Sequence, residues 1–339
     1  GFTSIMQDTA TTLAQKPGPL VAIWNNPLLQ AFLNDPVTLV SGVFIVVIFL
    51  AVIFAPLVSP HDPLEQQISL RHLGPLSVGS AIIKKPTAGQ IEAGQTTDDR
   101  FYLLGTDHLG RDMLSRLIDG GRISLTVGVL GVVVSGSIGI FLGLLAGYYR
   151  GVVDDVIMRV VDIFMSVPLL FLALMVLFIL GPSFTNIIIV FAVARWMLYC
   201  RVTRGVVMSL REQTFIEAAR AIGCSDQRVI GRHIMPNLIT PLMTIAALEV
   251  PRNILTESAL SFLGFGIQPP DSSWGLMLAS GREYITSAWW VVVVPGMAIF
   301  LTALSFNLFG VWLRAVSDPL QRWRGLKATK EAKEAGISF

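Results

Sequence analysis

The residues best suited to chemistry in this sequence are charged side chains that interrupt long apolar stretches. Glu249 and Arg252 lie three residues apart around Pro251, Glu257 follows in the same stretch, and Arg195 interrupts an earlier one. Residues three apart share one face of a helix, so we expect a structural ion pair between Glu249 and Arg252. The alternative is that this region lines a polar pathway through a membrane. In either case each charge costs a few kcal/mol in lipid unless it is paired or hydrated.

The sequence contains no recognisable catalytic motif. HExxH, CxxC and GxSxG are all absent, and the four histidines lie far apart along the chain. The phosphate-binding loop Gly-x-x-x-x-Gly-Lys-Ser/Thr is absent too, because the dipeptide Gly-Lys does not occur. We therefore expect a chain that is not an enzyme, that binds no cofactor or metal and that leaves any ATP hydrolysis to a partner. An intramembrane site built on aspartates is the one enzymatic alternative left open.

A pair of short helices is expected in a basic segment between two apolar stretches. Thr214 with Glu217 three residues later predicts a capping box, and Gly223 predicts a left-handed stop for the first helix. The second helix is expected over 225–233, and Pro236 then opens the next long helix. A hairpin of this length is too short to be stable by itself.

One face of the first short helix is apolar and needs a partner. Phe215, Ala219 and Ile222 share this face, and Ile216 lies at its edge. The face can pack on the rest of this protein, or it can dock in the groove of another protein. Amphipathicity alone does not choose between these alternatives.

Composition indicates the solvent in which these elements lie. Of the 339 residues, 53% are hydrophobic and 14% are charged, whereas soluble proteins carry roughly 25% charged residues. The net charge of +2 is too small for a nucleic-acid-binding surface, so no nucleic-acid partner is expected. Disordered, collagen-like and disulfide-rich classes are excluded as well. The sequence is typical of an all-α polytopic membrane protein.

Six membrane-spanning helices are expected, because about 20 apolar residues cross the hydrocarbon core of a bilayer. The third stretch needs a turn or two of extension at its start, and the fourth and fifth contain charges. The stretches are 37–58, 123–149, 164–180, 187–200, 238–265 and 288–313.

The distribution of lysine and arginine predicts that both termini lie in the cytoplasm. The segment 201–236 holds six arginines against three acids, and the tail from residue 314 holds six basic residues against three acids. The two short loops on the opposite side contain only one basic residue. The segment 59–122 holds seven basic residues but also eight acids, and long translocated segments follow the rule weakly.

These elements divide the chain into successive regions. A separate amphipathic helix near 109–119 is expected to lie on the membrane interface. The regions are a cytoplasmic arm over 1–36, a first span over 37–58, an extracytoplasmic loop over 59–122, a five-helix core over 123–313 that contains a cytoplasmic loop over 201–236, and a cytoplasmic tail over 314–339.

The second span carries a stripe of small residues. Gly131, Ser135, Gly139, Gly143 and Gly147 repeat at a strict four-residue spacing. This spacing predicts close backbone-to-backbone packing against another helix, either of this chain or of a second subunit.

The spacing within 217–236 resembles the EAA loop of ABC importer permeases. That motif reads EAA, three residues, Gly, nine residues and Ile-x-Leu-Pro. Here Glu217-Ala218-Ala219 is followed by Gly223 and then by His-Ile-Met-Pro ending at Pro236. The departures from the motif are His233 for Ile and Met235 for Leu.

Further segments are similar to the C-subunit type of dipeptide and oligopeptide permeases, and together they extend from about 101 to 323. The segment 59–99 departs from that type because it is longer. The matching segments are GTDHLGRDMLSR at 105–116, SALSFLGFG at 258–266, QPP at 268–270, SWG at 273–275 and DPL at 318–320.

The resemblance implies a type I ABC importer permease in a bacterial inner membrane. In this family a second permease subunit completes the pathway, two ATPase subunits bind ATP and Mg, and an extracytoplasmic binding protein delivers the peptide. The implied contacts with an ATPase are Thr214, Phe215, Glu217, Ala218, Ala219, Arg220, Gly223 and Pro236. Basic side chains of the loop would face acidic partner surface or membrane lipid.

The resemblance also implies a role for the intramembrane charges and names alternative substrates. Glu249, Arg252 and Glu257 would line the pathway and offer charges to the termini of a peptide. Members of the family also carry nickel complexes, glutathione or opines. A secondary transporter would show inverted halves and ion-coupling acids in its spans, and no such halves are visible. Nothing specific favours a purely structural membrane protein.

Overall fold

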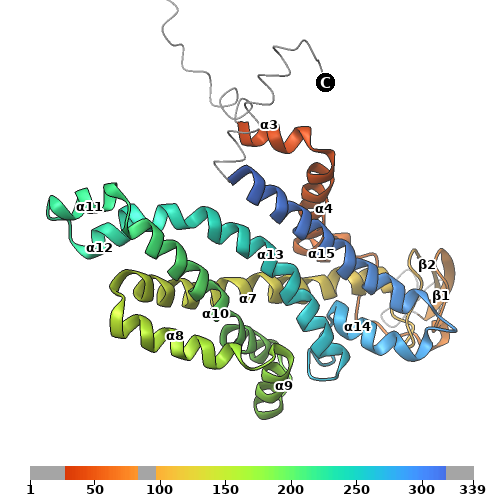
Figure 1. The fold of residues 1–339 in the computed structure, drawn as a ribbon. Coiled ribbons are helices and arrows are strands. Elements are labelled where there is room, and N and C mark those ends of the chain that lie inside the picture. Colours follow the sequence, from red (N-terminus) through yellow and green to blue (C-terminus); the bar gives the residue numbers. More distant parts are fainter. Residues whose placement is uncertain (1–26, 83–96, 318–339) are drawn as a thin grey trace, which may run out of the picture.

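The computed structural model describes residues 27–82 and 97–317, most of them in helices (Figure 1). This part of the chain begins with α3 (Pro27–Asn34), α4 (Pro36–Ile53) and the short turn α5 (Ala55–Val58). Asp35 caps α4, because its carboxylate accepts from the N–H of Val37 while Pro36 occupies the first turn. The expected helical membrane fold is confirmed, with one small sheet added to it.

The helices that follow are longer, and they form the body of the molecule. They are α7 (Met113–Tyr149), α8 (Gly151–Met165), α9 (Leu169–Leu180), α10 (Phe184–Arg211), α11 (Thr214–Ala221), α12 (Asp226–Arg228), a π-helical segment (Val229–Ile234), α13 (Met235–Phe262), α14 (Trp274–Gly281) and α15 (Trp290–Ser317). Single 3₁₀ turns occur at Ile68–Leu70 and Arg282–Tyr284.

Five helices of the described part are long and apolar enough to cross a membrane: α4, α7, α10, the continuous helix Asp226–Phe262, and α15. The expected third span is instead a bent pair, because α8 and α9 meet at 87°. Pro168 lies at the bend and disfavours helical backbone at the residue before it. By itself α9 has 12 residues, about 18 Å of helix, so a count of six spans requires α8 and α9 together.

The expected interfacial helix near 109–119 is not a separate element. Asp112 caps α7 by accepting from the N–H groups of Leu114 and Ser115, and the helix then runs unbroken into the second span. Met113 and Ile118, on its apolar face, are buried, and so is Arg116. The apolar face that suggested contact with the membrane surface packs against the protein itself.

The stripe of small residues on α7 packs against α10 of the same chain. A Cβ added at Gly143 would lie 2.6 Å from the carbonyl oxygen of Cys200, and one added at Gly147 would lie 2.8 Å from Cβ of Val207. Glycines later in α7 contact residues later in α10, so the two helices run parallel. Because α7 and α10 run in the same direction, α8 and α9 must return the chain to the other end.

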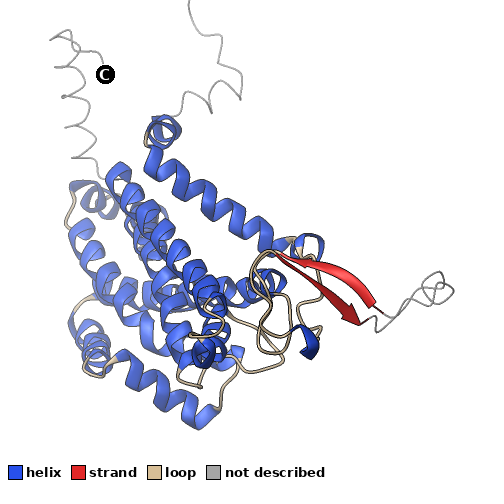
Figure 2. Cartoon of the chain, turned by 90° about the vertical axis from the view of Figure 1, so that its right-hand side faces the viewer, coloured by secondary structure: helices blue, strands red, loops and turns tan. Residues whose placement is uncertain are grey.

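The segment 59–112 contains a two-stranded antiparallel sheet that the all-α expectation lacked. Strand β1 (Ser77–Ile82) pairs with β2 (Thr97–Tyr102), with Ser77 opposite Tyr102. Figure 2 shows this hairpin projecting from one end of the helices. Leu70, Ala81 and Tyr102 form its small core.

The two ends of the described chain lie near each other. Phe32 of α3 packs edge-on against Phe309 and Trp312 of α15, with ring centroids 6.5 and 5.3 Å apart. Residues 1–26 of the expected arm over 1–36 and residues 318–339 of the expected tail over 314–339 lie outside the described residues. Which end of the molecule faces the cytoplasm stays a prediction.

Candidate functional site

The short helix α11 lies at the end of the molecule opposite the β-hairpin (Figure 1). It follows α10, which continues to Arg211 and so turns the first part of the expected loop 201–236 into helix. The 37-residue helix α7, about 55 Å long, separates α11 from the β-hairpin.

The expected capping box at the start of α11 is wrong. Gln213 is the N-cap residue, Thr214 is already helical, and no side chain caps this end. The carbonyl oxygen of Gln213 accepts from the N–H groups of Ile216 and Glu217, at 2.9 and 3.2 Å. Because Thr214 lies inside the first turn, its hydroxyl is not placed to bind the free N–H groups. Glu217 is exposed and free to face a partner.

The expected left-handed stop at Gly223 is confirmed. Gly223 has φ of +82°. Its N–H donates to the carbonyl of Arg220 at 2.9 Å, and the N–H of Cys224 donates to the carbonyl of Ala219 at 3.1 Å. These two bonds form a complete Schellman motif, which satisfies the last carbonyls of the helix.

The apolar residues of α11 divide between two faces. Ile216 and Ala219 are buried against this chain, whereas the Phe215 and Ile222 side chains are exposed, Phe215 at 46% and Ile222 at 81%. Ala218 is also exposed, and the spacing 215, 218, 222 places all three on one outward face. We call Phe215, Ala218 and Ile222 the outer face of α11. The expected single apolar face is therefore divided: Ile216 and Ala219 pack on this chain, and the outer face is uncovered in this chain. Docking of the outer face on another protein stays a prediction.

Tyr148, near the end of α7, holds the hairpin of α11 and α12 in place. Its hydroxyl donates to Oδ1 of Asp226 at 2.6 Å. The guanidinium groups of Arg220 and Arg211 lie 5.1 and 5.7 Å from the centre of its ring, within range of cation–π attraction. Arg220 therefore contacts this chain as well as solvent. Sequence reasoning missed Tyr148, because Tyr148 and Asp226 are 78 positions apart and no local pattern connects them.

The expected second helix of the hairpin is not separate from the span after it. The single turn α12 continues through the π-helical segment Val229–Ile234 into α13. Pro236 lies in the first turn of α13; it lacks an N–H, and its ring would clash with the carbonyl of Arg232 in regular α-helix. A wider π turn accommodates such an interruption. Pro236 therefore lies within one continuous helix and does not open a new one.

The intramembrane charges form a cluster of three residues. Arg252 donates from Nη1 to Oε1 of Glu249 at 2.8 Å, as expected, and Arg195 donates to Oε2 of Glu249 at 3.0 Å. Arg195 also donates to Oγ1 of Thr256 at 3.1 Å. Glu249 itself is buried. The sequence placed Arg195 in a span but did not connect it to Glu249, because the two residues lie on α10 and α13.

Glu257 is buried where α7, α13 and the start of α14 meet, and it does not face an open pathway. Its carboxyl group accepts from the hydroxyls of Ser261, Ser273 and Ser124 at 2.7, 2.9 and 3.4 Å. These serines lie on α13, before α14 and on α7. The expectation that Glu257 lines the pathway is therefore corrected, because hydroxyl groups enclose its carboxyl group.

A second charged cluster lies at the β-hairpin end. Asp107 accepts from Nε of Arg111 at 2.7 Å and from Nη1 of Arg116, and Arg116 also reaches the hydroxyl of Ser272. Burial pushes the pKa of Asp107 up, but the charges of Arg116 and Arg111 and two backbone N–H groups outweigh it and hold this pKa below its ordinary value. Asp107 is therefore ionised at neutral pH.

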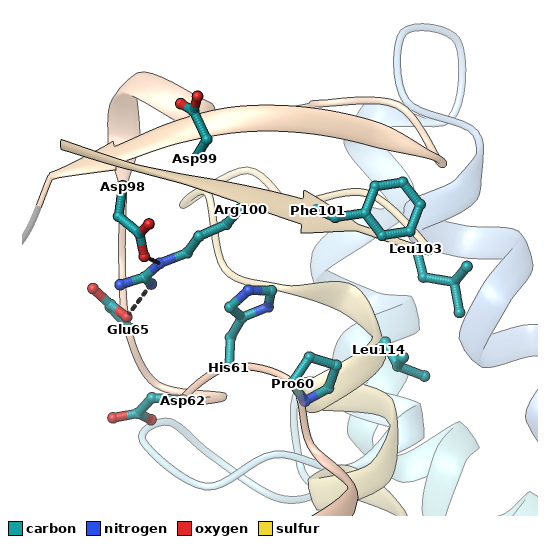
Figure 3. A pocket seen from close by; sticks show the side chains of 10 residues that line it. All are labelled: Pro60, His61, Asp62, Glu65, Asp98, Asp99, Arg100, Phe101, Leu103 and Leu114. Carbon is teal, nitrogen blue, oxygen red and sulfur yellow. Dashed lines mark hydrogen bonds and ion pairs between the residues drawn. The ribbon is translucent and has the colours of Figure 1, made fainter.

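A pocket of about 800 Å³ opens at the same end of the molecule, between the β-hairpin, the segment 60–65 and the start of α7 (Figure 3). Arg100 bridges Glu65 and Asp98 across it, at 2.7 and 3.5 Å, and His61 points into it. Nδ1 of His61 lies 3.4 Å from Oδ2 of Asp112. Among residues 27–82 and 97–317, no group of three or more His, Cys, Asp or Glu is placed to hold a metal ion.

Two sequence families match the chain. The family described as binding-protein-dependent transport system inner membrane component matches residues 139–323. The N-terminal TM domain of oligopeptide transport permease C matches residues 28–75. Together they cover α11, the cluster around Glu249 and the first span.

Individual relatives match over most of their length. A di/tripeptide transport system permease of Pseudomonas aeruginosa is 40% identical, and the match covers 89% of this chain and 93% of the relative. A probable D,D-dipeptide transport system permease of Escherichia coli is 35% identical, with 91% and 96% covered. A chain of the inward-facing MetNI methionine ABC transporter has a TM-score of 0.48 and 15% identity, with 61% of this chain and 98% of that chain covered. The expected resemblance is confirmed: this chain belongs to the family of inner membrane components of binding-protein-dependent transport systems.

Proposed function

We propose that this chain is one of two permease subunits of an ATP-driven importer of dipeptides or oligopeptides in a bacterial inner membrane. A binding protein on the outer side delivers the peptide, and two ATPase subunits supply the energy. Family membership supports the transport role, and the names of the two bacterial relatives support a peptide as the solute. ATP and Mg belong to the ATPases in this proposal, since the sequence lacks a phosphate-binding loop.

The observation that carries the coupling proposal is the two-sided helix α11. Its outer face of Phe215, Ala218 and Ile222 is exposed, while Ile216 and Ala219 on the adjoining side are buried in this chain. A short helix that is fixed on one side and apolar on the other suits insertion into a groove on a partner. We assign that groove to an ATPase subunit.

The contacts below α11 give a route from this docking face into the membrane. Tyr148 connects the hairpin to the end of α7, and Asp226 begins the helix that continues through α13. A displacement of α11 therefore acts on two spans at once. Glu249 and Arg252 lie on α13, so the same displacement reaches the intramembrane charges.

Each residue of the hairpin has a role in this proposal. Phe215 supplies apolar contact area, Ala218 allows close approach, and Glu217 offers a charge to the ATPase. The remaining proposed coupling residues shape or hold the helix: Thr214 in its first turn, Ala219 in its buried face, Arg220 on Tyr148, Gly223 at its end and Pro236 at the π turn.

The test uses the complete importer in proteoliposomes, with ATP inside and the binding protein outside. Glu217→Lys reverses a charge on the exposed side of α11, and Gln227→Lys adds the same lysine at an exposed position of α12 as the matched control. We expect Glu217→Lys to lower ATP-driven peptide uptake by about tenfold or more, as losses at interface hot spots do. Gln227→Lys should leave uptake near the wild-type rate.

Two further measurements complete this test. Membrane insertion and retention of the second permease should be unchanged in Glu217→Lys, while binding of the ATPase or stimulation of its activity by the binding protein falls. Wild-type uptake in Glu217→Lys would contradict the docking of α11 on an ATPase.

A further inference from the structure

The cluster of Arg195, Glu249 and Arg252 has two guanidinium groups but only one carboxylate. Both carboxylate oxygens of Glu249 are occupied, Oε1 by Arg252 and Oε2 by Arg195. One carboxylate balances one guanidinium, so the second guanidinium leaves a surplus charge of about +1. A surplus charge within a membrane span needs water or a counter-charge.

The surplus lies on Arg252 and not on Arg195. Arg195 is enclosed, with its side chain 14% exposed and a second bond to Thr256. The Arg252 side chain is 62% exposed, and within the described residues its guanidinium makes one hydrogen bond, from Nη1 to Glu249. The remaining N–H groups of the Arg252 guanidinium are therefore available to a ligand on this face of α13.

The guanidinium of Arg252 cannot reach the membrane surface to be hydrated there. It follows Met235 by 17 positions and precedes Phe262 by ten, which places it about 26 and 15 Å from the two ends of α13. The bond to Glu249, one turn back along the helix, holds its guanidinium away from the nearer end. Leu255, one turn further on, is also exposed. The face of α13 that carries Arg252 must therefore border water or another protein surface.

We propose that Arg252 binds the C-terminal carboxylate of the peptide in transit, and that Glu249 and Arg195 position its guanidinium. This inference rests on the proposed peptide-import function. Each free peptide carries such a carboxylate, and a guanidinium binds it through two parallel charge-assisted hydrogen bonds. Glu249 holds Arg252 in place and lowers the net charge of the site, so that the anion can leave again.

The experiment replaces the charge and then restores it chemically. The background is Cys224→Ser in the complete reconstituted importer, since Cys224 is a half-buried native thiol whereas Cys200 is fully buried. Arg252→Cys removes the guanidinium, and Leu255→Cys is the control on the same exposed face. A methanethiosulfonate reagent then adds either a trimethylammonium or a sulfonate group: the thiolate attacks the reagent, a mixed disulfide forms, and methanesulfinate leaves.

We expect Arg252→Cys to take up peptide about tenfold more slowly than its background, the size of one lost charge-assisted contact. The cationic reagent should restore most of the uptake, and the anionic reagent should not. In Leu255→Cys the two reagents should have the same effect on uptake. Added peptide should protect Arg252→Cys from modification.

Three results would overturn the proposal. The first is uptake in Arg252→Cys equal to that of the background. The second is rescue by both reagents alike. The third is loss of the second permease from purified Arg252→Cys complexes, which would assign Arg252 to an ion pair between subunits. Failure of the proposed function is a different result, because the wild-type importer itself would then show no ATP-driven peptide uptake.

Discussion

Two clusters in this protein have the same charges but different surroundings. At the β-hairpin end Asp107 pairs with Arg111 and Arg116, and within the spans Glu249 pairs with Arg195 and Arg252. Each cluster joins one carboxylate to two guanidiniums, so each carries a net charge of about +1.

Burial distinguishes the two clusters. Arg111 and Arg116 are 11% and 5% exposed, and Arg116 also bonds to Ser272. In the other cluster Arg252 is 62% exposed. The closed cluster fixes the chain where it enters α7, whereas the open cluster presents a charge to something outside this chain. The same set of residue types can therefore stabilise a fold or receive a ligand, and accessibility decides which.

The largest effect should come from removing the carboxylate of the closed cluster. Asp107→Asn leaves two enclosed guanidiniums without a counter-charge, which costs about 3–5 kcal/mol. We expect a marked fall in the melting temperature of the purified complex in mild detergent. Asp98→Asn is the control, since its side chain is 53% exposed and its loss should change little. An unchanged melting temperature in Asp107→Asn would show that this cluster does not stabilise the fold.

A smaller loss of stability is expected from the same change in the open cluster. In Glu249→Gln the guanidinium of Arg252 can turn outward, so mainly Arg195 loses a buried partner, at a cost of about 1–3 kcal/mol. Peptide uptake should fall with it, because Arg252 is no longer positioned. A melting temperature lower than that of Asp107→Asn would reverse the distinction between the clusters.

Acid should affect the closed cluster only below about pH 4. The pKa of Asp107 is lower in the folded protein than its ordinary value, so the stabilisation is fully present above about pH 4. As the pH falls from there to the folded-state pKa, each unit removes up to about 1.4 kcal/mol. The difference in melting temperature between wild-type protein and Asp107→Asn should be constant from pH 8 to about pH 5 and should shrink towards pH 3. A constant difference between them at every pH would contradict an ionised Asp107.

The smallest effect on stability is expected for Arg252→Gln. An exposed side chain outside the packed interior typically changes stability by no more than about 0.5 kcal/mol, so its melting temperature should match the wild type while uptake falls. Arg116→Gln is the comparison in the closed cluster and should destabilise clearly. Equal melting temperatures for these two variants would show that exposure does not separate the clusters.

The elements that depend on local pattern were predictable from the sequence. The positions of the long apolar helices follow from the absence of charges over about 20 residues. The end of α11 follows from Gly223, since glycine readily adopts the positive φ that this turn requires. The pair Glu249–Arg252 follows from helical spacing. In each case the interacting residues lie within a few positions of one another.

Predictions failed where a local pattern has two physical outcomes. The amphipathic stretch before the second span can lie on a membrane or pack inside a protein, and here it begins α7. Thr214 can cap a helix or occupy its first turn, and here Gln213 takes the N-cap position without a side-chain hydrogen bond. Pro236 can open a helix or be accommodated in a π turn.

The sequence by itself determined that this chain lies in lipid, where most of its long helices run, and that a short helix ended by Gly223, with the spacing of a permease loop, separates two of them. Only the tertiary structure decided that α10 packs on the glycine stripe, that Tyr148 holds the hairpin of α11 and α12, and that Arg195 shares Glu249 with Arg252. The physical reason is that these contacts join helices far apart in the chain. Which side chains meet, and which stay exposed, depends on how whole helices pack.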